Sequence, residues 1–311
     1  MSKHILLTGG AGFIGANMAE RLAQNPEHQV VVVDNFRTGE PAKLPNPEQY
    51  PNVRFIKCDV NVFEDISSIF YAFKFDYVFH YAALVGVKRT LANPVSVLND
   101  IHGIENILKL SKNTGVKRVF FSSSSEVYGE PVEFPQNERT TPLNSRLPYA
   151  VVKNIGESFL RSYYQEYGLE YTIFRFFNTY GPKQSRDFVV SRFMHLALEG
   201  KPLTIYGDGQ QTRTFCFIKD NIDACYAAFE KDMFINDVVN VGGNIEVTIK
   251  ELAEVIIDVT KSSSTLKHLP PLPEGDMTRR LPDTTKMDQL LQRPRIKLQE
   301  GLKTLLESKS F

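Results

Sequence analysis

The chain has 311 residues, of which 42% are hydrophobic and 23% charged, a composition typical of globular proteins that excludes a disordered, collagenous or coiled-coil chain. Its 36 Lys and Arg residues balance 36 Asp and Glu residues, so overall charge gives no reason to bind nucleic acid or an anionic membrane. Three cysteines without metal-like spacing predict neither a disulfide framework nor a zinc site. With no visible signal peptide and no long apolar run, we expect a cytoplasmic protein that acts on a small molecule.

Short β-branched runs alternate with longer amphipathic stretches in the first part of the chain, as strands alternate with helices in a parallel sheet. The runs that predict strands are residues 5–8, 30–34, 53–57, 77–80, 119–122 and 171–176. The stretches that predict helices are residues 16–25, 66–73, 101–114 and 150–167, with Pro94 near the start of a longer helix. Right-handed crossovers between such elements build a Rossmann-type doubly wound α/β sheet.

The pattern changes after residue 177, where a turn at 181–184 is followed by a predicted helix, 189–198, and a short strand, 203–206. The stretch 215–229, followed by 238–241, predicts strand, helix and strand. We therefore expect a first domain over residues 1–177, with its sheet completed by about 214–242. A smaller, interleaved C-terminal α/β substrate domain is expected over 178–311. Residues 261–275, with three serines and three prolines, predict a loop-rich connection, and 298–306 predict a terminal helix.

A glycine-rich segment, residues 8–15, follows the first predicted strand and opens the first predicted helix. Gly9, Gly12 and Gly15 allow a sharp turn and let backbone N–H groups approach a pyrophosphate at the positive end of the helix. Such a run alone also fits an ordinary tight turn. Here the second predicted strand ends in Asp34, whose carboxylate can accept both ribose hydroxyls of an adenosine and would repel the extra phosphate of NADP. The segment therefore predicts an NAD site.

Tyr149 and Lys153 stand four positions apart on a predicted helix, so their side chains share one face. A free tyrosine has a pKa of about 10, and a nearby ammonium together with a positive nicotinamide would favour the phenolate. The serine-rich run 122–129 lies at the carboxyl end of a predicted strand, the edge at which open α/β sheets bind ligands. Each feature alone fits a helix face or a loop. Together they indicate an acid/base site.

The chain resembles the extended short-chain dehydrogenases/reductases, specifically the NAD-dependent nucleotide-sugar epimerases and dehydratases of the UDP-glucose 4-epimerase type. The resemblance covers nearly the whole chain. The motifs that carry it are 8–15, Asp34, 59–60, 80–83, 122–129, 149–153, 175–178 with 180–182, and 206–209 with 211–213. By this resemblance Tyr149 is the acid/base, Lys153 lowers its pKa and holds the nicotinamide ribose, and Ser124 hydrogen-bonds the sugar 4-hydroxyl.

The same resemblance, with the glycine fingerprint, extends the predicted site. The cofactor contacts are Gly9, Gly12, Phe13, Ile14, Gly15, Asp34, Asn35, Asp59, Val60, Ala82, Tyr149 and Lys153. The substrate contacts are Lys88, Ser124, Asn178, Arg213 and Arg280, and arginine forks suit the oxygens of a diphosphate. Asp59 also fits an ordinary loop aspartate, and each arginine alone an ordinary surface residue. Tyr81 and Asp100 depart from the family pattern, in which an aliphatic residue and Asn are usual.

The reaction stays open among three outcomes of one first step, in which Tyr149 removes the proton of the 4-hydroxyl while hydride passes from C4 to NAD. We favour a C4-epimerase, because residues 86–88 resemble the loop of uronic acid epimerases. A UDP-glucuronate decarboxylase is the alternative that Arg280 supports. A 4,6-dehydratase is the third, although Ser125 replaces the aspartic acid of the dTDP-glucose enzymes. Glu126, a fourth catalytic candidate, resembles the carboxylate of dehydratases and decarboxylases.

A catalytically silent NAD-binding regulatory protein would share this fold, since fold does not fix function. The complete set of Ser124, Tyr149 and Lys153 argues for an enzyme. Family members commonly pair through two helices, for which 101–114 and 150–167 are the candidates here. The expected partners are therefore a nucleotide-diphosphate sugar and a second copy of the chain, with no nucleic acid, membrane or metal.

Overall fold

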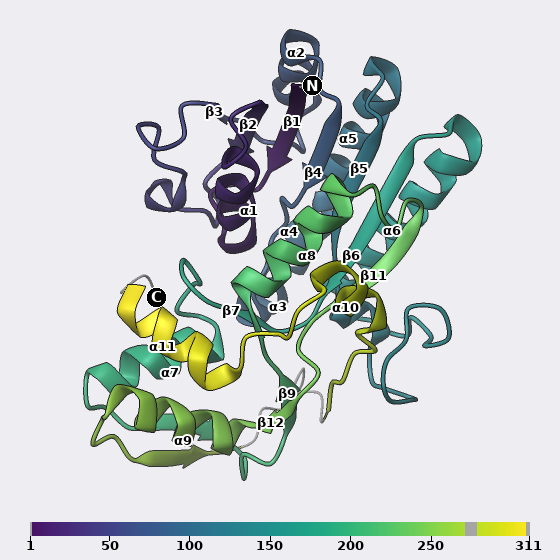
Figure 1. Ribbon diagram of the computed structural model, residues 1–311. Helices are drawn as coiled ribbons and strands as arrows, with labels where there is room; N and C mark the ends of the chain where they lie inside the picture. Colours follow the sequence, from purple (N-terminus) through teal and green to yellow (C-terminus); the bar gives the residue numbers. More distant parts are fainter. Residues whose placement is uncertain (1, 271–278, 309–311) are drawn as a thin grey trace. The chain divides into compact units, whose positions relative to one another are not determined.

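The computed structural model describes residues 2–270 and 279–308, apart from the side chains of Val87, Lys88 and Leu91 (Figure 1). The chain forms two compact units. Unit 1 comprises the described residues of 1–129, 143–175 and 225–239, and unit 2 those of 130–142, 176–224 and 240–311. Each unit is thus assembled from three separate stretches of the sequence.

A seven-stranded sheet, ordered β11-β6-β5-β4-β1-β2-β3, forms the centre of unit 1. Its strands are β1 (Lys3–Thr8), β2 (His28–Asp34), β3 (Val53–Lys57), β4 (Tyr77–His80), β5 (Arg118–Ser124), β6 (Glu170–Phe176) and β11 (Asp237–Val241). The central strand β1 pairs in parallel with both β2 and β4. The six strands predicted over residues 1–177 are confirmed, several with longer ends, and so is the doubly wound α/β fold.

Helices cover the sheet between successive strands. They are α1 (Phe13–Ala23), α2 (Phe63–Phe73), α3 (Val87–Ala92), α4 (Pro94–Leu98), α5 (Asp100–Thr114) and α6 (Pro148–Tyr167). The prediction of one longer helix starting near Pro94 is wrong. The backbone N–H of His102 bonds the carbonyl of Asn99 at 3.1 Å, an i to i+3 turn that tightens the chain and separates α4 from α5.

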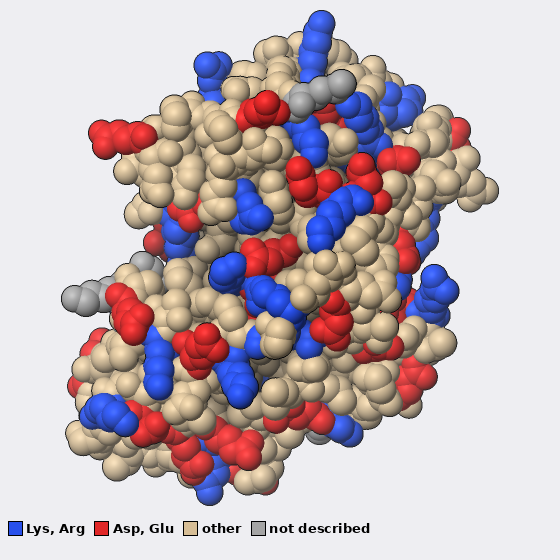
Figure 2. Space-filling model, in the orientation of Figure 1, with Lys and Arg blue, Asp and Glu red and all other residues tan. Residues whose placement is uncertain are grey.

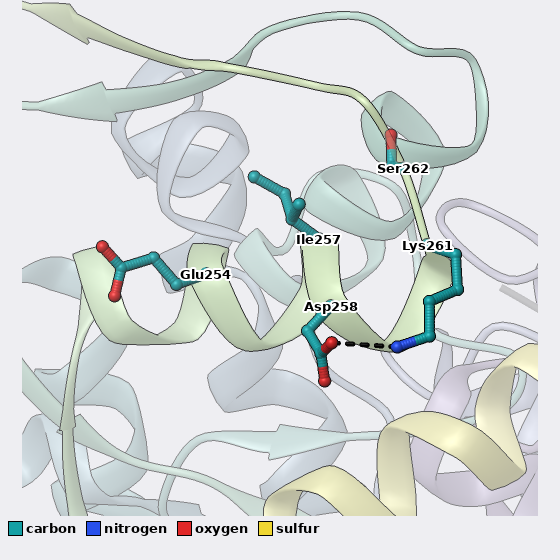
Figure 3. A pocket seen from close by; sticks show the side chains of 5 residues that line it. All are labelled: Glu254, Ile257, Asp258, Lys261 and Ser262. Atoms are coloured by element: carbon teal, nitrogen blue, oxygen red, sulfur yellow. Dashed lines mark hydrogen bonds and ion pairs between the residues drawn. The ribbon is translucent and has the colours of Figure 1, made fainter.

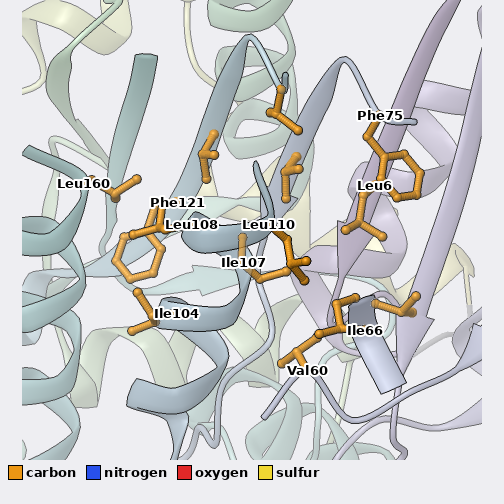
Figure 4. Packing of buried hydrophobic residues seen from close by; sticks show 14 of the residues in the cluster. Leu6, Val60, Ile66, Phe75, Ile104, Ile107, Leu108, Leu110, Phe121 and Leu160 are labelled. Atoms are coloured by element: carbon orange, nitrogen blue, oxygen red, sulfur yellow. The ribbon is translucent and has the colours of Figure 1, made fainter. Parts of the chain in front are cut away.

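Alternation along the strands gives the sheet two apolar faces. On one face, Leu6 of β1 and Phe121 of β5 pack against α2, α5 and α6 (Figure 4). On the other face the rings of Phe79 and Phe120 stack at 4.4 Å, and Phe229 meets Phe79 edge-on at 5.6 Å. Both faces of the inner strands are buried, as in other parallel sheets, whereas the edge strand β3 has no fully buried residue.

Unit 2 is built from short strand pairs and helices. The pairs are β7 (Thr179–Tyr180) with β10 (Cys216–Phe217), β9 (Thr212–Thr214) with β12 (Glu246–Thr248), and β8 (Leu203–Tyr206) with β13 (Leu266–Leu269). The helices are α7 (Val189–Leu198), α9 (Ile249–Thr260), α10 (Thr285–Leu291) and α11 (Leu298–Ser308), and α8 (Ile218–Glu230) runs from unit 2 into unit 1.

The loop predicted over residues 261–275 is wrong at 266–269, which form β13 in parallel with β8. Strand β13 forms because it pairs with β8, which is distant in the sequence. The local sequence is rich in serine and proline and therefore does not predict a strand. Residues 271–275 of that prediction lie outside the described part of the chain.

Charged side chains of both signs are interspersed on the face shown in Figure 2, consistent with the balanced composition. Within the described ranges, no helix has the length and apolar character needed to cross a membrane.

Candidate active site

The strand order reverses direction between β1 and β4, since the chain runs from β1 to β2 and β3 on one side and from β4 to β5 and β6 on the other. Open α/β sheets bind their ligands at the carboxyl ends of two such strands. The Thr8 hydroxyl ties the two ends, accepting hydrogen bonds from the backbone N–H groups of Tyr81 and Ala82, both at 3.1 Å. Gly9 follows at φ +73°, and a Cβ there would lie 2.7 Å from the nitrogen of Ala82. Only glycine allows this close approach of the two strand ends.

The N-terminus of α1 carries no side-chain cap at Gly12 and no acidic residue in its first turn. A Cβ on Gly15 would lie 2.2 Å from the carbonyl oxygen of Gly9, so packing within the protein requires that glycine. A Cβ on Gly12 would meet that oxygen at 3.2 Å and no other atom within 4 Å. Gly12 is therefore not demanded by the protein's own packing. Its missing side chain leaves backbone N–H groups at the positive end of α1 open to a pyrophosphate.

Protein contacts fix the carboxylate at the end of β2. Asp34 accepts hydrogen bonds from the backbone N–H groups of Ala11 at 3.0 Å and Phe36 at 2.8 Å. The Asn35 amide donates to Asp59 at 2.9 Å, and Asp59 also accepts from the N–H of Asn61 at 2.9 Å. Asp34 thus lies at the end of β2, where dinucleotide-binding folds of this kind carry the acidic residue that binds the adenosine ribose, and Asp59 follows the end of β3.

The predicted acid/base group is assembled where β5 ends against α6. The Ser124 hydroxyl lies near enough to Tyr149 to lower its pKa, and it accepts a hydrogen bond from the backbone N–H of Glu126 at 3.2 Å. Lys153 is buried, donates to the Ser122 hydroxyl at 3.3 Å, and has its ammonium 5.8 Å from the Tyr149 ring centroid. The structure therefore brings together all four predicted catalytic residues, Ser124, Glu126, Tyr149 and Lys153.

Burial shifts the titration of both members of the helix pair. It raises the pKa of Tyr149 well above its usual value, and the charge of Glu126 raises it further, while the Ser124 hydroxyl opposes the shift. Burial lowers the pKa of Lys153 to about 8, and the charge of Asp100 opposes that shift. Asp100 accepts a hydrogen bond from the N–H of Leu84 at 2.6 Å, and burial raises its own pKa. Such shifts are typical of groups that exchange protons.

The other predicted substrate contacts lie mainly in unit 2. The buried Nδ2 of Asn178 has no hydrogen-bond partner among the described residues, a donor that a ligand oxygen would satisfy. Arg213 on β9 donates to the carbonyl of Thr212 at 2.8 Å, and Arg280 is buried. Lys88 belongs to α3, but its side chain lies outside the described part of the structure.

A pocket at the end of α9 is separate from these residues. Glu254, Ile257, Asp258, Lys261 and Ser262 line it, and the ammonium of Lys261 pairs with Asp258 at 2.9 Å (Figure 3). None of the predicted site residues lies there.

Glu157, a buried acid one turn beyond Lys153, was missed by the sequence analysis. The four-residue spacing that links Tyr149 to Lys153 also points to it.

The doubly wound fold and the open end of α1 are typical of a dinucleotide-binding α/β protein, and the Tyr149–Lys153 pair is its candidate acid/base site. The model of the NAD-dependent epimerase/dehydratase family matches residues 5–242. The chain belongs to this family, and its cofactor is NAD. The family resemblance and the cofactor inferred from the sequence motifs are thereby confirmed.

Named relatives include both decarboxylases and epimerases. UDP-glucuronic acid decarboxylase 6 of Arabidopsis thaliana is 34% identical over 97% of this chain and 88% of its own length. UDP-glucose 4-epimerase of Thermotoga maritima, solved with UDP-glucose, is 33% identical with a TM-score of 0.91, covering 98% of this chain and 97% of that one. UDP-glucuronic acid 4-epimerase of Bacillus cereus, solved with UDP-glucuronic acid and NAD, is 32% identical with a TM-score of 0.87, covering 98% of each chain.

Proposed function

We propose that the protein is an NAD-dependent 4-epimerase of a UDP-sugar. The observation that carries this proposal is the buried ammonium of Lys153 at 5.8 Å from the centre of the Tyr149 ring, with the Ser124 hydroxyl near enough to Tyr149 to lower its pKa. A protein that only binds NAD has no need for a tyrosine, a hydroxyl and an ammonium so arranged. The choice of a UDP-sugar and of epimerisation is supported by the two solved epimerases, which carry UDP-glucose and UDP-glucuronic acid.

Bound NAD would take up a hydride from the carbon that bears the reacting hydroxyl and could later return it. The α1 N-terminus would hold the pyrophosphate and Asp34 the adenosine ribose. Tyr149 would accept the proton of the sugar 4-hydroxyl while Ser124 holds that oxygen by a hydrogen bond. The positive charge of Lys153 favours the phenolate form that this step requires. Inversion at C4 then needs the sugar to present its opposite face before Tyr149 gives the proton back.

Unit 1 is proposed to bind the cofactor and unit 2 to bind most of the sugar nucleotide. The orphaned amide of Asn178 supports the second assignment, because a buried donor without a partner costs free energy until a ligand satisfies it. Arg213 and Arg280 are proposed to bind the diphosphate, for which planar guanidinium groups are well suited. Lys88 is the remaining proposed contact.

Decarboxylation of a UDP-uronic acid is the second candidate. Oxidation at C4 places a ketone β to the carboxylate of such a sugar, and a β-keto acid loses carbon dioxide readily. The 34% identity with the plant decarboxylase favours this outcome, as does the buried Arg280 as a partner for a carboxylate. Both candidates use the same first step at Tyr149, so they differ only in the fate of the 4-keto sugar.

A homodimer is proposed for the working enzyme. Val95 and Leu98 on α4 are 71% and 42% exposed, and Tyr164 and Tyr167 on α6 are 44% and 53% exposed. Large apolar side chains exposed on two helices that pack together are typical of a surface that another chain covers. Size-exclusion chromatography with light scattering would test this, and a monomer at micromolar concentration would contradict it.

The three buried free thiols fit the proposed cytoplasmic location.

The test of function is incubation of the NAD-loaded protein with UDP-glucose, UDP-N-acetylglucosamine and UDP-glucuronic acid, followed by proton NMR of the products. We expect the C4 epimer of one sugar. Release of carbon dioxide with a UDP-pentose product would instead establish the decarboxylase. The variant Tyr149→Phe should abolish turnover and retain NAD. Unchanged turnover in this variant would refute the proposed acid/base, and no turnover by the wild type would favour the regulatory alternative.

A further inference from the structure

Helix α6 carries a fully buried carboxylate beyond the proposed catalytic pair. Glu157 has no exposed surface. One of its oxygens accepts from the Ser123 hydroxyl at 2.6 Å and from Arg175 Nε at 2.8 Å. The other accepts from Arg175 Nη2 at 2.7 Å and Arg161 Nη2 at 2.9 Å. Both oxygens are thus doubly satisfied, and all of these residues belong to unit 1.

Two of these contacts lead to the segment 122–129, which we call the serine loop. Ser123 belongs to it directly. Arg175 reaches its other end, where Nη1 donates to the Tyr128 hydroxyl at 2.9 Å and the guanidinium carbon lies 4.8 Å from the Tyr128 ring centroid. Ser124 and Glu126 lie between these two anchored positions. The carboxylate on α6 therefore holds the serine loop on both sides of the residues proposed to face the sugar.

The same carboxylate lies in register with the acid/base pair. Tyr149, Lys153 and Glu157 follow one another at four-residue intervals on α6, so they share one helix face. Burial alone would raise the pKa of Glu157, but hydrogen bonds and charge from Arg175, with Ser123 and Arg161, hold it below the usual value. The group is therefore ionised at neutral pH and forms charge-assisted hydrogen bonds, which are short and directional.

We propose that Glu157 is a positioning residue for the reaction, acting through Ser123 and through Arg175 to hold Ser124 beside Tyr149. The inference rests on the proposed function, because it takes the Ser124–Tyr149 pair as the acid/base site. It assigns to Glu157 no contact with substrate or cofactor. Misplacement of a reacting group by about 1 Å can cost about 100-fold in rate, so a small shift of the serine loop should be visible in turnover.

Two matched variants separate positioning from general stability. Ser123→Ala and Arg161→Gln each remove one hydrogen bond from Glu157, but only Ser123 belongs to the serine loop, whereas the Arg161 side chain is 42% exposed. With the NAD-loaded enzyme, Ser123→Ala should lower kcat by about 10- to 100-fold. Its KM and NAD affinity should stay within about twofold. Arg161→Gln should leave all three within about twofold. Equal loss of kcat in the two variants would overturn the proposal.

Tyr128→Phe tests the second route, since it removes the hydroxyl that Arg175 holds while leaving Glu157 fully bonded. A several-fold fall in kcat at unchanged KM is expected, and wild-type kcat would contradict this branch. A readout independent of turnover is the NMR spectrum of protein with ¹³C-labelled tyrosine, with the Tyr149 signal assigned from Tyr149→Phe. Ser123→Ala should shift that signal and Arg161→Gln should not.

The two measurements also separate the inference from the function on which it rests. If the wild type converts none of the sugars but the Tyr149 signal shifts only in Ser123→Ala, the proposed function fails and the positioning contact stands. If the wild type is active and the signal is the same in both variants, the positioning role fails and the function stands.

Discussion

Tyr149, Lys153 and Glu157 lie along one face of α6, and the two ends of this row differ in how firmly the charge of each group is fixed. At the N-terminal end, Tyr149 and Lys153 have pKa values that burial moves away from their usual range. At the other end, Glu157 is fully buried with Arg175 of β6, and the two charges neutralise each other through two hydrogen bonds of 2.8 and 2.7 Å. The comparison shows that one face of α6 carries both groups with shifted pKa values and a carboxylate whose charge is fixed by an arginine of β6.

The largest effect on turnover is expected from substitution of Lys153. Lys153→Met would remove the ammonium that favours the Tyr149 phenolate, and kcat should fall by about 100-fold or more, within the range that general acid–base groups contribute. Steady-state kinetics with the substrate identified by NMR would measure the loss. Turnover within about threefold of the wild type would show that Lys153 is a structural lysine.

Substitution of Glu157, at the other end of the row, should lower the stability of the protein. Glu157→Leu would leave Arg175 buried without its carboxylate, and the free energy of unfolding in urea should fall by about 3–5 kcal/mol. Glu251→Ala is a suitable control, because its carboxylate is an exposed part of the α9 capping box and should cost about 1 kcal/mol. A loss no larger than that of the control would show that the buried pair contributes little.

This stabilisation has a defined pH dependence. The pKa of Glu157 is lowered on folding, so the stabilisation is present above its unfolded-state pKa of about 4.3. It is lost as the pH falls below that value through the folded-state pKa. The stability difference between the wild type and Glu157→Gln should therefore shrink in acid.

A pair of glycine variants tests the cofactor site. Gly15→Ala would place a Cβ 2.2 Å from the Gly9 carbonyl oxygen and should destabilise the fold, whereas in Gly12→Ala the nearest contact is 3.2 Å. Gly12→Ala should fold with nearly wild-type stability and bind NAD about 10-fold more weakly, because its methyl group occupies the approach to the α1 N-terminus. Calorimetry and thermal melting would measure both. Wild-type NAD affinity in Gly12→Ala would argue against a pyrophosphate at this position.

The smallest expected effect is a shift in the pH profile. The charges of Glu126 and, to a lesser extent, Asp100 raise the pKa of Tyr149. Glu126→Gln should therefore move the acid limb of kcat/KM to lower pH, and Asp100→Asn should move it less in the same direction. Asp100→Asn should also move the alkaline limb to lower pH. The charge of Asp100 raises the pKa of Lys153, which is about 8, so without that charge Lys153 would lose its proton at a lower pH. Glu126→Gln should otherwise spare an epimerase, and severe loss would favour elimination chemistry.

Local patterns were sufficient to predict most of unit 1. The strands from β1 to β6 are rich in β-branched and aromatic residues, and the glycine segment and the Tyr149–Lys153 spacing fall on the elements that the sequence predicted. In unit 2, strands such as β9 and β12 were missed, because they are three residues long and exist only through pairing across the chain. Helix α9 was also missed, although the Thr248–Glu251 capping box is a sequence signal that predicts its start.

The residues of the candidate site that belong to sequence motifs were predictable. Those whose role depends on burial in the folded protein were not. A glutamate on a helix is usually solvated, so the four-residue spacing from Lys153 to Glu157 was too weak a signal to single this residue out. Its role depends on Arg175, which lies on β6 and was quoted in a motif without a role. The shifted pKa values of Tyr149 and Lys153 likewise arise from the packing around β5 and α6, which a linear sequence does not show.

The position of β11 has a consequence for synthesis of the chain. This strand borders β6 at the end of the sheet, yet β6 ends at Phe176 and β11 starts only at Asp237. While the polypeptide is still emerging from the ribosome, the backbone N–H and C=O groups along that side of β6 have no neighbouring strand. Such open edges are prone to misassociation. The nascent protein is therefore most vulnerable during translation of the segment between these two strands.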